Sequence, residues 1–204
     1  MPRRAILLAA LLAAAATAAP GQAAAPKPQL TDAKGDAVGA QAGTDIVSVT
    51  YSTTGTGSGR SYVPKKLVVT LTTAGDVLTN PGITYEVGAM TTSCDLVTFS
   101  AQQGTPYSSV VGVNGWAEWG GCDVPGSDGP TNVQLVTVVA KGNTLTWSFP
   151  IKMLPKGLKV GTVFSDFVAR VDPTNPVIPF PSSTTQTDLG LIDAGASAAK
   201  WKMG

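Results

Sequence analysis

The sequence predicts an all-β fold, a single antiparallel β-sandwich of jelly-roll type stabilised by one disulfide. Three observations lead to this prediction. Apolar and polar residues alternate with a period of two in about eight short runs, as expected of strands that bury one face. Turns rich in Gly, Pro and Asn separate these runs. Beyond the N-terminal apolar run, no long segment has the 3.6-residue period of a helix.

The run at residues 46–51 is the first predicted strand, with Val47, Val49 and Tyr51 on one face and Ser48 and Thr50 on the other. Residues 133–140 are apolar on both faces, which predicts a place in the middle of a sheet, and a hairpin turn connects them to residues 144–149. The predicted strands lie at residues 46–51, 66–72, 83–87, 96–100, 109–113, around Trp116 and Trp119, and at 133–140, 144–149 and 163–171.

The N-terminal residues have the pattern of a secretory signal peptide at residues 1–18. Arg3 and Arg4 precede an apolar run over residues 5–16, and small residues follow it. We expect cleavage after Ala18, or as late as residue 25. The apolar run is shorter than the roughly 20 residues that a helix needs to span a bilayer, so no membrane span is expected. The mature chain is therefore predicted to be secreted and extracellular.

The mature chain is expected to form one domain. Residues 19–30 predict a disordered leader, residues 31–193 the β-sandwich domain, and the Ala- and Gly-rich residues 194–204 a flexible tail. Cys94 and Cys122 predict one disulfide in an exported chain. By closing a loop in the unfolded chain, such a bridge stabilises the fold by about 3–4 kcal/mol.

The composition excludes several classes of function. Without Arg3 and Arg4 the 14 basic residues become 12, against 13 acidic residues, so the mature protein is close to neutral. A nucleic acid partner is not expected, because binding to phosphates needs clustered Lys and Arg. The chain has no histidine, which rules out a Ser-His-Asp triad and removes the usual ligands of zinc and haem.

Two segments resemble a known family. Residues 32–37 form an Asp-rich start that leads into a strand at residues 44–49. Residues 143–154 contain a strand that ends at Pro150, and the turn at residues 157–162 and a further strand follow. This arrangement resembles the secreted actinobacterial β-sandwich domains related to the DOMON and family-nine carbohydrate-binding superfold, over roughly residues 30–172. The resemblance implies a sandwich that binds sugar, haem or neither, since a shared fold does not choose among these functions.

Aromatic residues near the second cysteine are the candidate ligand-binding residues. Trp116 and Trp119 lie three residues apart, so a regular strand would point them to opposite faces, whereas a bulge would bring both to one surface. Together with Tyr107 they would offer flat ring faces to a sugar. The alternative is that one or both tryptophans fill the core beside the disulfide. Trp147 alternates with Leu145 and Phe149 and is predicted to lie in the core.

Glu86 and Glu118 are the only glutamates of the chain, and both fall in predicted strands. Retaining glycosidases use two carboxylates about 5–5.5 Å apart, one as nucleophile and one as acid. The two residues are therefore the candidate catalytic pair of the alternative, enzymatic hypothesis. The low aromatic content, 6%, argues against the aromatic-lined cleft that such enzymes need, and exposed strand glutamates are common.

A calcium site is a further hypothesis. Asp32, Asp36 and Asp45 could supply hard oxygen ligands to Ca²⁺, although their spacing is not that of an EF-hand and Asp beside Gly is typical of turns. A second group of aspartates would have to converge on the same place. The candidates for that second group are Asp166, Asp172 and Asp188.

These observations favour a secreted, non-catalytic β-sandwich that binds an extracellular polysaccharide or protein, or that has a structural role. The enzymatic alternative is a small glycoside hydrolase that uses Glu86 and Glu118. A third hypothesis is an inhibitor or surface protein that acts through the loop at residues 120–130, which the disulfide would stiffen.

Overall fold

The computed structural model describes residues 26–37, 42–77, 83–92, 96–103, 113–120, 132–154, 158–173 and 193–204. This part of the chain is mostly antiparallel β-structure in two sheets, which confirms the all-β prediction. The strands are β1 (Leu30–Thr31), β2 (Ile46–Thr56), β3 (Val63–Thr73), β4 (Ile83–Thr91), β5 (Leu96–Gln103), β6 (Val113–Gly120), β7 (Asn132–Lys141), β8 (Thr144–Pro150), β9 (Val163–Pro173) and β10 (Asp193–Lys202). Two short 3₁₀ turns, η1 (Gly59–Ser61) and η2 (Ile151–Met153), follow β2 and β8. Within the described ranges, no helix has the length and hydropathy needed to cross a membrane.

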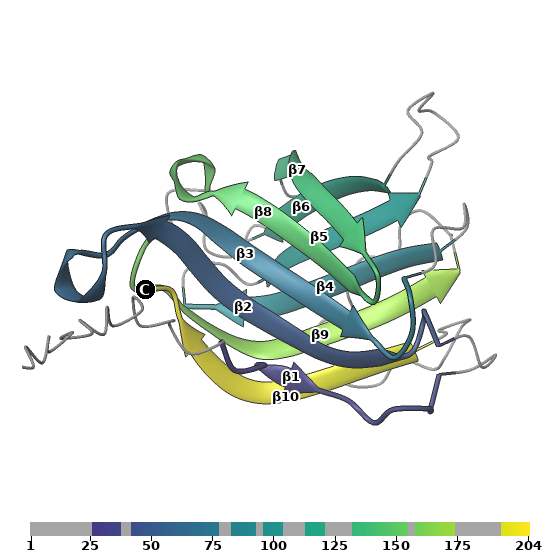
Figure 1. The fold of residues 1–204 in the computed structure, drawn as a ribbon. Helices are drawn as coiled ribbons and strands as arrows, with labels where there is room; N and C mark the ends of the chain where they lie inside the picture. Colours follow the sequence, from purple (N-terminus) through teal and green to yellow (C-terminus); the bar gives the residue numbers. More distant parts are fainter. Residues whose placement is uncertain are drawn as a thin grey trace, which may run out of the picture.

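Each strand pairs with its neighbours in the order β1-β2-β3-β8-β7-β6-β5-β4-β9-β10. The strand β7 connects the two layers, because its first half pairs with β6 up to Val136 and its second half pairs with β8 from Thr137 onward. The two ends of the order, β1 and β10, lie side by side (Figure 1), so that a Cβ added at Gly195 of β10 would lie 3.1 Å from Cδ2 of Leu30 in β1.

The strand β7 lies in the middle of the strand order, but each of its halves pairs with one neighbour only, so residues 133–140 are not flanked by strands on both sides as a mid-sheet strand would be. Its apolar character does not mean that both faces are covered, either. Leu135 is 82% exposed and Val139 is 54% exposed, so one face of this strand is open to solvent.

The core lies between the two layers and is lined by alternate residues of the strands. Trp147 is 0% exposed, as predicted, and its indole Nε1 donates a hydrogen bond of 2.8 Å to the carbonyl of Ser100. Because Trp147 belongs to β8 and Ser100 to β5, this bond connects the two layers. The other large, fully buried side chains are Tyr51, Phe99, Phe149, Phe164, Phe167, Leu30, Ile46, Leu67, Leu71, Leu145 and Met203.

A bulge in β9 directs two phenylalanines into this core. Phe164 and Phe167 are an odd number of residues apart, yet both are 0% exposed and both rings contact Tyr51, with centroids at 5.7 and 4.9 Å. Between them Asp166 has a φ of 50°, in the left-handed region that Asp tolerates better than most residues. The extra residue changes which face the following side chains occupy.

The prediction of a flexible tail at residues 194–204 is wrong, since β10 covers most of this segment. The ring of Trp201 lies 5.4 Å from that of Phe164 and 5.9 Å from that of Tyr51, and Met203 is 0% exposed. Ala and Gly have low strand propensity, so the strand is held by its pairing with β9 and not by its composition. The fold also begins earlier than expected, because Leu30, placed in the disordered leader, is 1% exposed in β1.

Several predictions fall outside the described residues. They concern the signal peptide at residues 1–18, the cysteines Cys94 and Cys122, most of the strand at residues 109–113, and most of the loop at residues 120–130. The disulfide therefore stays a prediction.

Candidate functional site

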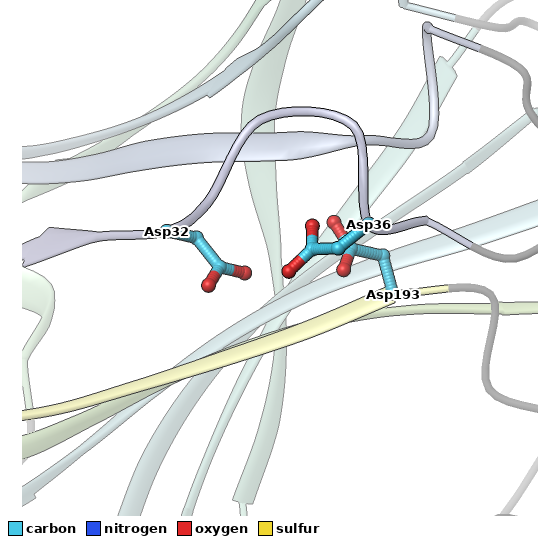
Figure 2. A group of neighbouring side chains, drawn as sticks. All are labelled: Asp32, Asp36 and Asp193. Atoms are coloured by element: carbon cyan, nitrogen blue, oxygen red, sulfur yellow. The ribbon is translucent and has the colours of Figure 1, made fainter.

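Three carboxylates meet where the two ends of the strand order adjoin. Asp32 directly follows β1, Asp36 lies in the turn toward β2, and Asp193 is the first residue of β10. One oxygen atom of each lies within 4.8 Å of the others. Figure 2 shows the three side chains turned toward one another, and we call Asp32, Asp36 and Asp193 the aspartate cluster.

The turn between Asp32 and Asp36 is shaped by local hydrogen bonds. Gly35 has a φ of 94°, which favours glycine, and its N–H donates to Oδ2 of Asp45 at 2.7 Å. The N–H of Ala33 donates to Oδ1 of Asp32 at 3.0 Å. These contacts hold the turn against the segment that enters β2.

The chain around Asp193 is equally constrained. Its carboxylate accepts hydrogen bonds from the N–H groups of Ile46 and Ala194 and thereby joins β10 to the start of β2. Two residues further on, a Cβ added at Gly195 would lie 2.8 Å from Oδ2 of Asp32. A larger residue at position 195 would therefore displace the Asp32 carboxylate from its place above β10.

The electrostatic environment of the cluster is unfavourable for its negative charges. Burial raises the pKa of Asp32 and of Asp193, and the charge of Asp36 raises both further. Among the described residues, no Lys or Arg forms an ion pair with these carboxylates. Two buried oxygens, Oδ2 of Asp32 and Oδ1 of Asp45, also accept no hydrogen bond from that part of the chain.

The structure brings two of the three predicted calcium ligands, Asp32 and Asp36, into one group, while Asp45 contacts the same turn through Gly35. It does not bring the expected second group there. Asp172 pairs with Arg170, Asp166 accepts a hydrogen bond from Ser165, and Asp188 is outside the described residues. The additional member, Asp193, was missed because no local pattern relates it to a turn that lies about 150 positions earlier in the chain.

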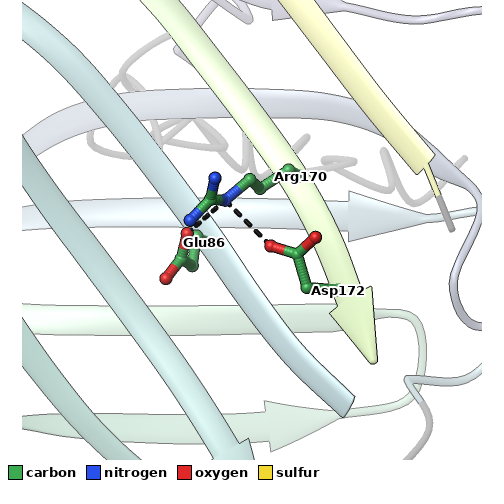
Figure 3. A network of polar contacts seen from close by, with 3 residues as sticks. All are labelled: Glu86, Arg170 and Asp172. Atoms are coloured by element: carbon green, nitrogen blue, oxygen red, sulfur yellow. Dashed lines mark hydrogen bonds and ion pairs between the residues drawn. The ribbon is translucent and has the colours of Figure 1, made fainter. Parts of the chain in front are cut away.

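A second group of charges lies on the outer face of the layer that contains β4 and β9. In register, Glu86 of β4 pairs with Arg170 of β9, and Asp172 is two residues further along β9 on the same face. Arg170 Nε forms ion pairs with Oε2 of Glu86 and, at 2.9 Å, with Oδ2 of Asp172 (Figure 3). We call these three residues the arginine network.

Burial has the largest effect on the two carboxylates of the arginine network. It raises the pKa of Glu86, although the hydrogen bond and the charge of Arg170 lower it, and the charges of Asp172 and Glu118 raise it further. Burial also raises the pKa of Asp172, again opposed by the charge of Arg170. Desolvation therefore outweighs ion pairing at both residues.

The arginine network belongs to a row of buried polar side chains. Strand register places Ser100 beside Glu86, and Glu118 of β6 beside Thr98, so the two glutamates occupy one face on either side of β5. Five polar residues on this face are no more than 9% exposed, in contrast to the usual solvated outer face of a sheet, while the side chains of Glu86 and Asp172 are 16% and 23% exposed. We call it the polar face, and its buried members are Thr84, Thr98, Ser100, Gln102 and Arg170.

The tryptophan predictions have mixed outcomes. Trp119 is 6% exposed and packs edge-on against Phe149 at 5.8 Å, so it belongs to the core and offers no exposed ring face for a ligand. Trp116 pairs with Ser100 in register, but its side chain is outside the described part of the structure. Tyr107 is outside it as well.

In comparisons with known proteins, no family model, no curated protein and no solved structure matches this chain. The resemblance to DOMON-like and family-nine carbohydrate-binding domains thus stays a prediction.

Proposed function

We propose that this protein is an exported, non-catalytic β-sandwich module that binds a polar extracellular ligand, with carbohydrate as the favoured class, on the polar face. The observation that carries the proposal is the arginine network set within a row of buried polar side chains. Such sites fix a ligand with a few well-placed polar groups.

The chemistry of the polar face suits a ligand rich in hydroxyl groups. Carboxylates accept hydrogen bonds, an arginine donates them, and Gln102 offers both a carbonyl and an amide. Two carboxylates hold Arg170 in place, so binding would cost little additional side-chain entropy. The side chains of Glu86 and Asp172 are 16% and 23% exposed, so a ligand would meet these carboxylates first, at the partly buried edge of the polar face, where a hydrogen bond is stronger than one in water.

The test is a glycan array followed by titration of the purified protein, read by tryptophan fluorescence. Gln102→Ala removes an amide from the polar face and is expected to weaken binding about tenfold, the loss of one good hydrogen bond of about 1.4 kcal/mol. The matched control is Thr70→Ala on β3, on the outer face of the other layer, which should leave affinity unchanged. If no saccharide binds, or if both variants lose affinity equally, the proposal fails.

One observation favours the glycoside hydrolase as a second candidate. Glu86 and Glu118 share the polar face, and a raised pKa is what a general acid such as Glu86 would need. The ion pair of Glu86 with Arg170 argues against this role, because it engages the carboxylate. Release of reducing ends from a bound polysaccharide, abolished by Glu118→Gln, would replace the binding proposal with the enzymatic one.

A further inference from the structure

We propose that the aspartate cluster is a calcium site, in which Asp32, Asp36 and Asp193 ligate one Ca²⁺ ion that fastens the β1–β2 turn to β10. This proposal is independent of the polar face. It differs from the expectation drawn from the sequence in its ligand set, since Asp193 replaces Asp45 as a direct ligand.

The spacing of the three carboxylates suits a single ion. Calcium binds oxygen ligands at about 2.3–2.6 Å, so two ligands on opposite sides of the ion are about 5 Å apart. The ligand atoms of the cluster all lie within 4.8 Å of one another, a separation that lets all three ligate one ion. Water would complete the six to eight positions that calcium takes.

Asp45 is a second, independent observation that points to a cation. Its side chain is 5% exposed, and its buried Oδ1 has no hydrogen-bond partner among the described residues. Its other oxygen accepts the N–H of Gly35, so the carboxylate lies against the turn that carries Asp32 and Asp36. Its charge is close enough to act on Asp32. A buried carboxylate oxygen without a donor is costly, and a nearby cation would offset that cost.

The surrounding backbone is built to keep these groups together. Gly195 leaves open the space that Oδ2 of Asp32 occupies, and that oxygen is itself buried without a partner in the described chain. Hydrogen bonds from Ile46 and Ala194 orient Asp193. Within the described residues, no Lys or Arg forms an ion pair with Asp32, Asp36, Asp45 or Asp193. Four carboxylates without such a partner favour a hard divalent cation over a neutral ligand.

Calcium is preferred to magnesium on geometric grounds. The ligands come from a turn and from a strand far apart in the chain, and calcium tolerates such irregular arrangements, whereas magnesium requires near-octahedral geometry and retains its waters. An ion in this position would join the two ends of the strand order, so it should stabilise the whole sandwich and not the turn alone.

The experiment uses the full secreted chain, freed of metal with a chelator and titrated with CaCl₂ by calorimetry and thermal unfolding. Calcium at 100 times its dissociation constant should raise the Tm by roughly 5–10 °C, and MgCl₂ should act much more weakly. The variant Asp36→Asn alters an exposed ligand and should weaken calcium binding at least tenfold. Asp193→Asn should do so more strongly.

Asp76→Asn, at an exposed aspartate outside the cluster, is the matched control and should bind calcium as the unmodified protein does. Asp193 also holds β2, so its variant is informative only if it folds, whereas Asp36→Asn tests the ligand role directly. The proposal is overturned if about 10 mM calcium, tenfold above the weakest affinities of extracellular modules, gives neither heat nor a Tm shift. Equal calcium affinities of Asp36→Asn and Asp76→Asn would overturn it as well. Glycan binding is measured separately, so failure here leaves the proposed function standing.

Discussion

Replacing Tyr51 with phenylalanine is expected to make the protein more stable. Tyr51 is 0% exposed, and its hydroxyl has no hydrogen-bond partner among the described residues. Burial accordingly raises the pKa of Tyr51 far above its usual value. A buried hydroxyl without a partner costs about 1–3 kcal/mol, and phenylalanine removes that cost.

The aromatic contacts of Tyr51 do not need the hydroxyl. Its ring lies 4.9 Å from that of Phe167 and 6.4 Å from that of Phe99, both in inclined geometries that a phenylalanine ring can keep. A few tenths of a kcal/mol are lost to the small void that remains. The expected net gain in the free energy of unfolding is therefore about 1–2 kcal/mol.

Tyr85 provides the matched comparison. It is 2% exposed, and its hydroxyl donates a hydrogen bond of 2.8 Å to the carbonyl of Gly43. Tyr85→Phe leaves this carbonyl without that donor and should lower the free energy of unfolding by about 1–3 kcal/mol. The same chemical change thus has opposite signs at two buried positions.

Urea unfolding of both variants measures the effect, with the midpoint interpreted at constant m-value. In thermal unfolding, each kcal/mol corresponds to a Tm change of about 2–4 °C for a chain of this size. A loss of stability in Tyr51→Phe of more than about 0.5 kcal/mol would refute the reasoning, because it would mean that the hydroxyl has a partner such as a buried water.

Two further predictions concern the arginine network and the tryptophans. Because burial raises the pKa of Glu86 above its ordinary 4.5, the folded state binds this proton more tightly than the unfolded state, so the free energy of unfolding falls as pH rises from 4.5 through the raised value. Glu86→Gln should remove this part of the pH dependence, and identical pH profiles would contradict the assignment. Trp147→Phe loses the bond to Ser100 and should cost about 2–4 kcal/mol in urea unfolding. Trp119→Phe should cost only about 1–2 kcal/mol, since the buried Nε1 of Trp119 has no hydrogen-bond partner in the described chain. A larger loss of stability for Trp119→Phe than for Trp147→Phe would contradict this prediction.

The strands could be predicted from the sequence because alternation is a local property. Residues 144–149 bury alternate side chains as expected, and Trp147 lies in the core. In residues 46–51 the alternation holds from Ser48 onward, whereas a register shift between Ile46 and Ser48 buries Ile46 and leaves Val47 half-buried. The turn with Asp32 and Asp36 was recognised as a candidate metal site for the same reason, since both residues are in one short segment. Trp119 illustrates the limit of this reasoning, because a single strand does not say which of its faces is covered.

The sequence by itself determined where the chain extends and where it turns, since a polar-apolar period of two is compatible only with a half-buried strand. Only the tertiary structure decided which strands became neighbours. It made residues 193–202 a strand despite their low propensity, and it brought Asp193 to Asp32 and Arg170 to Glu86. These contacts depend on pairing between distant segments, whose free energy comes from burying the shared core and not from the residues that meet at its edges.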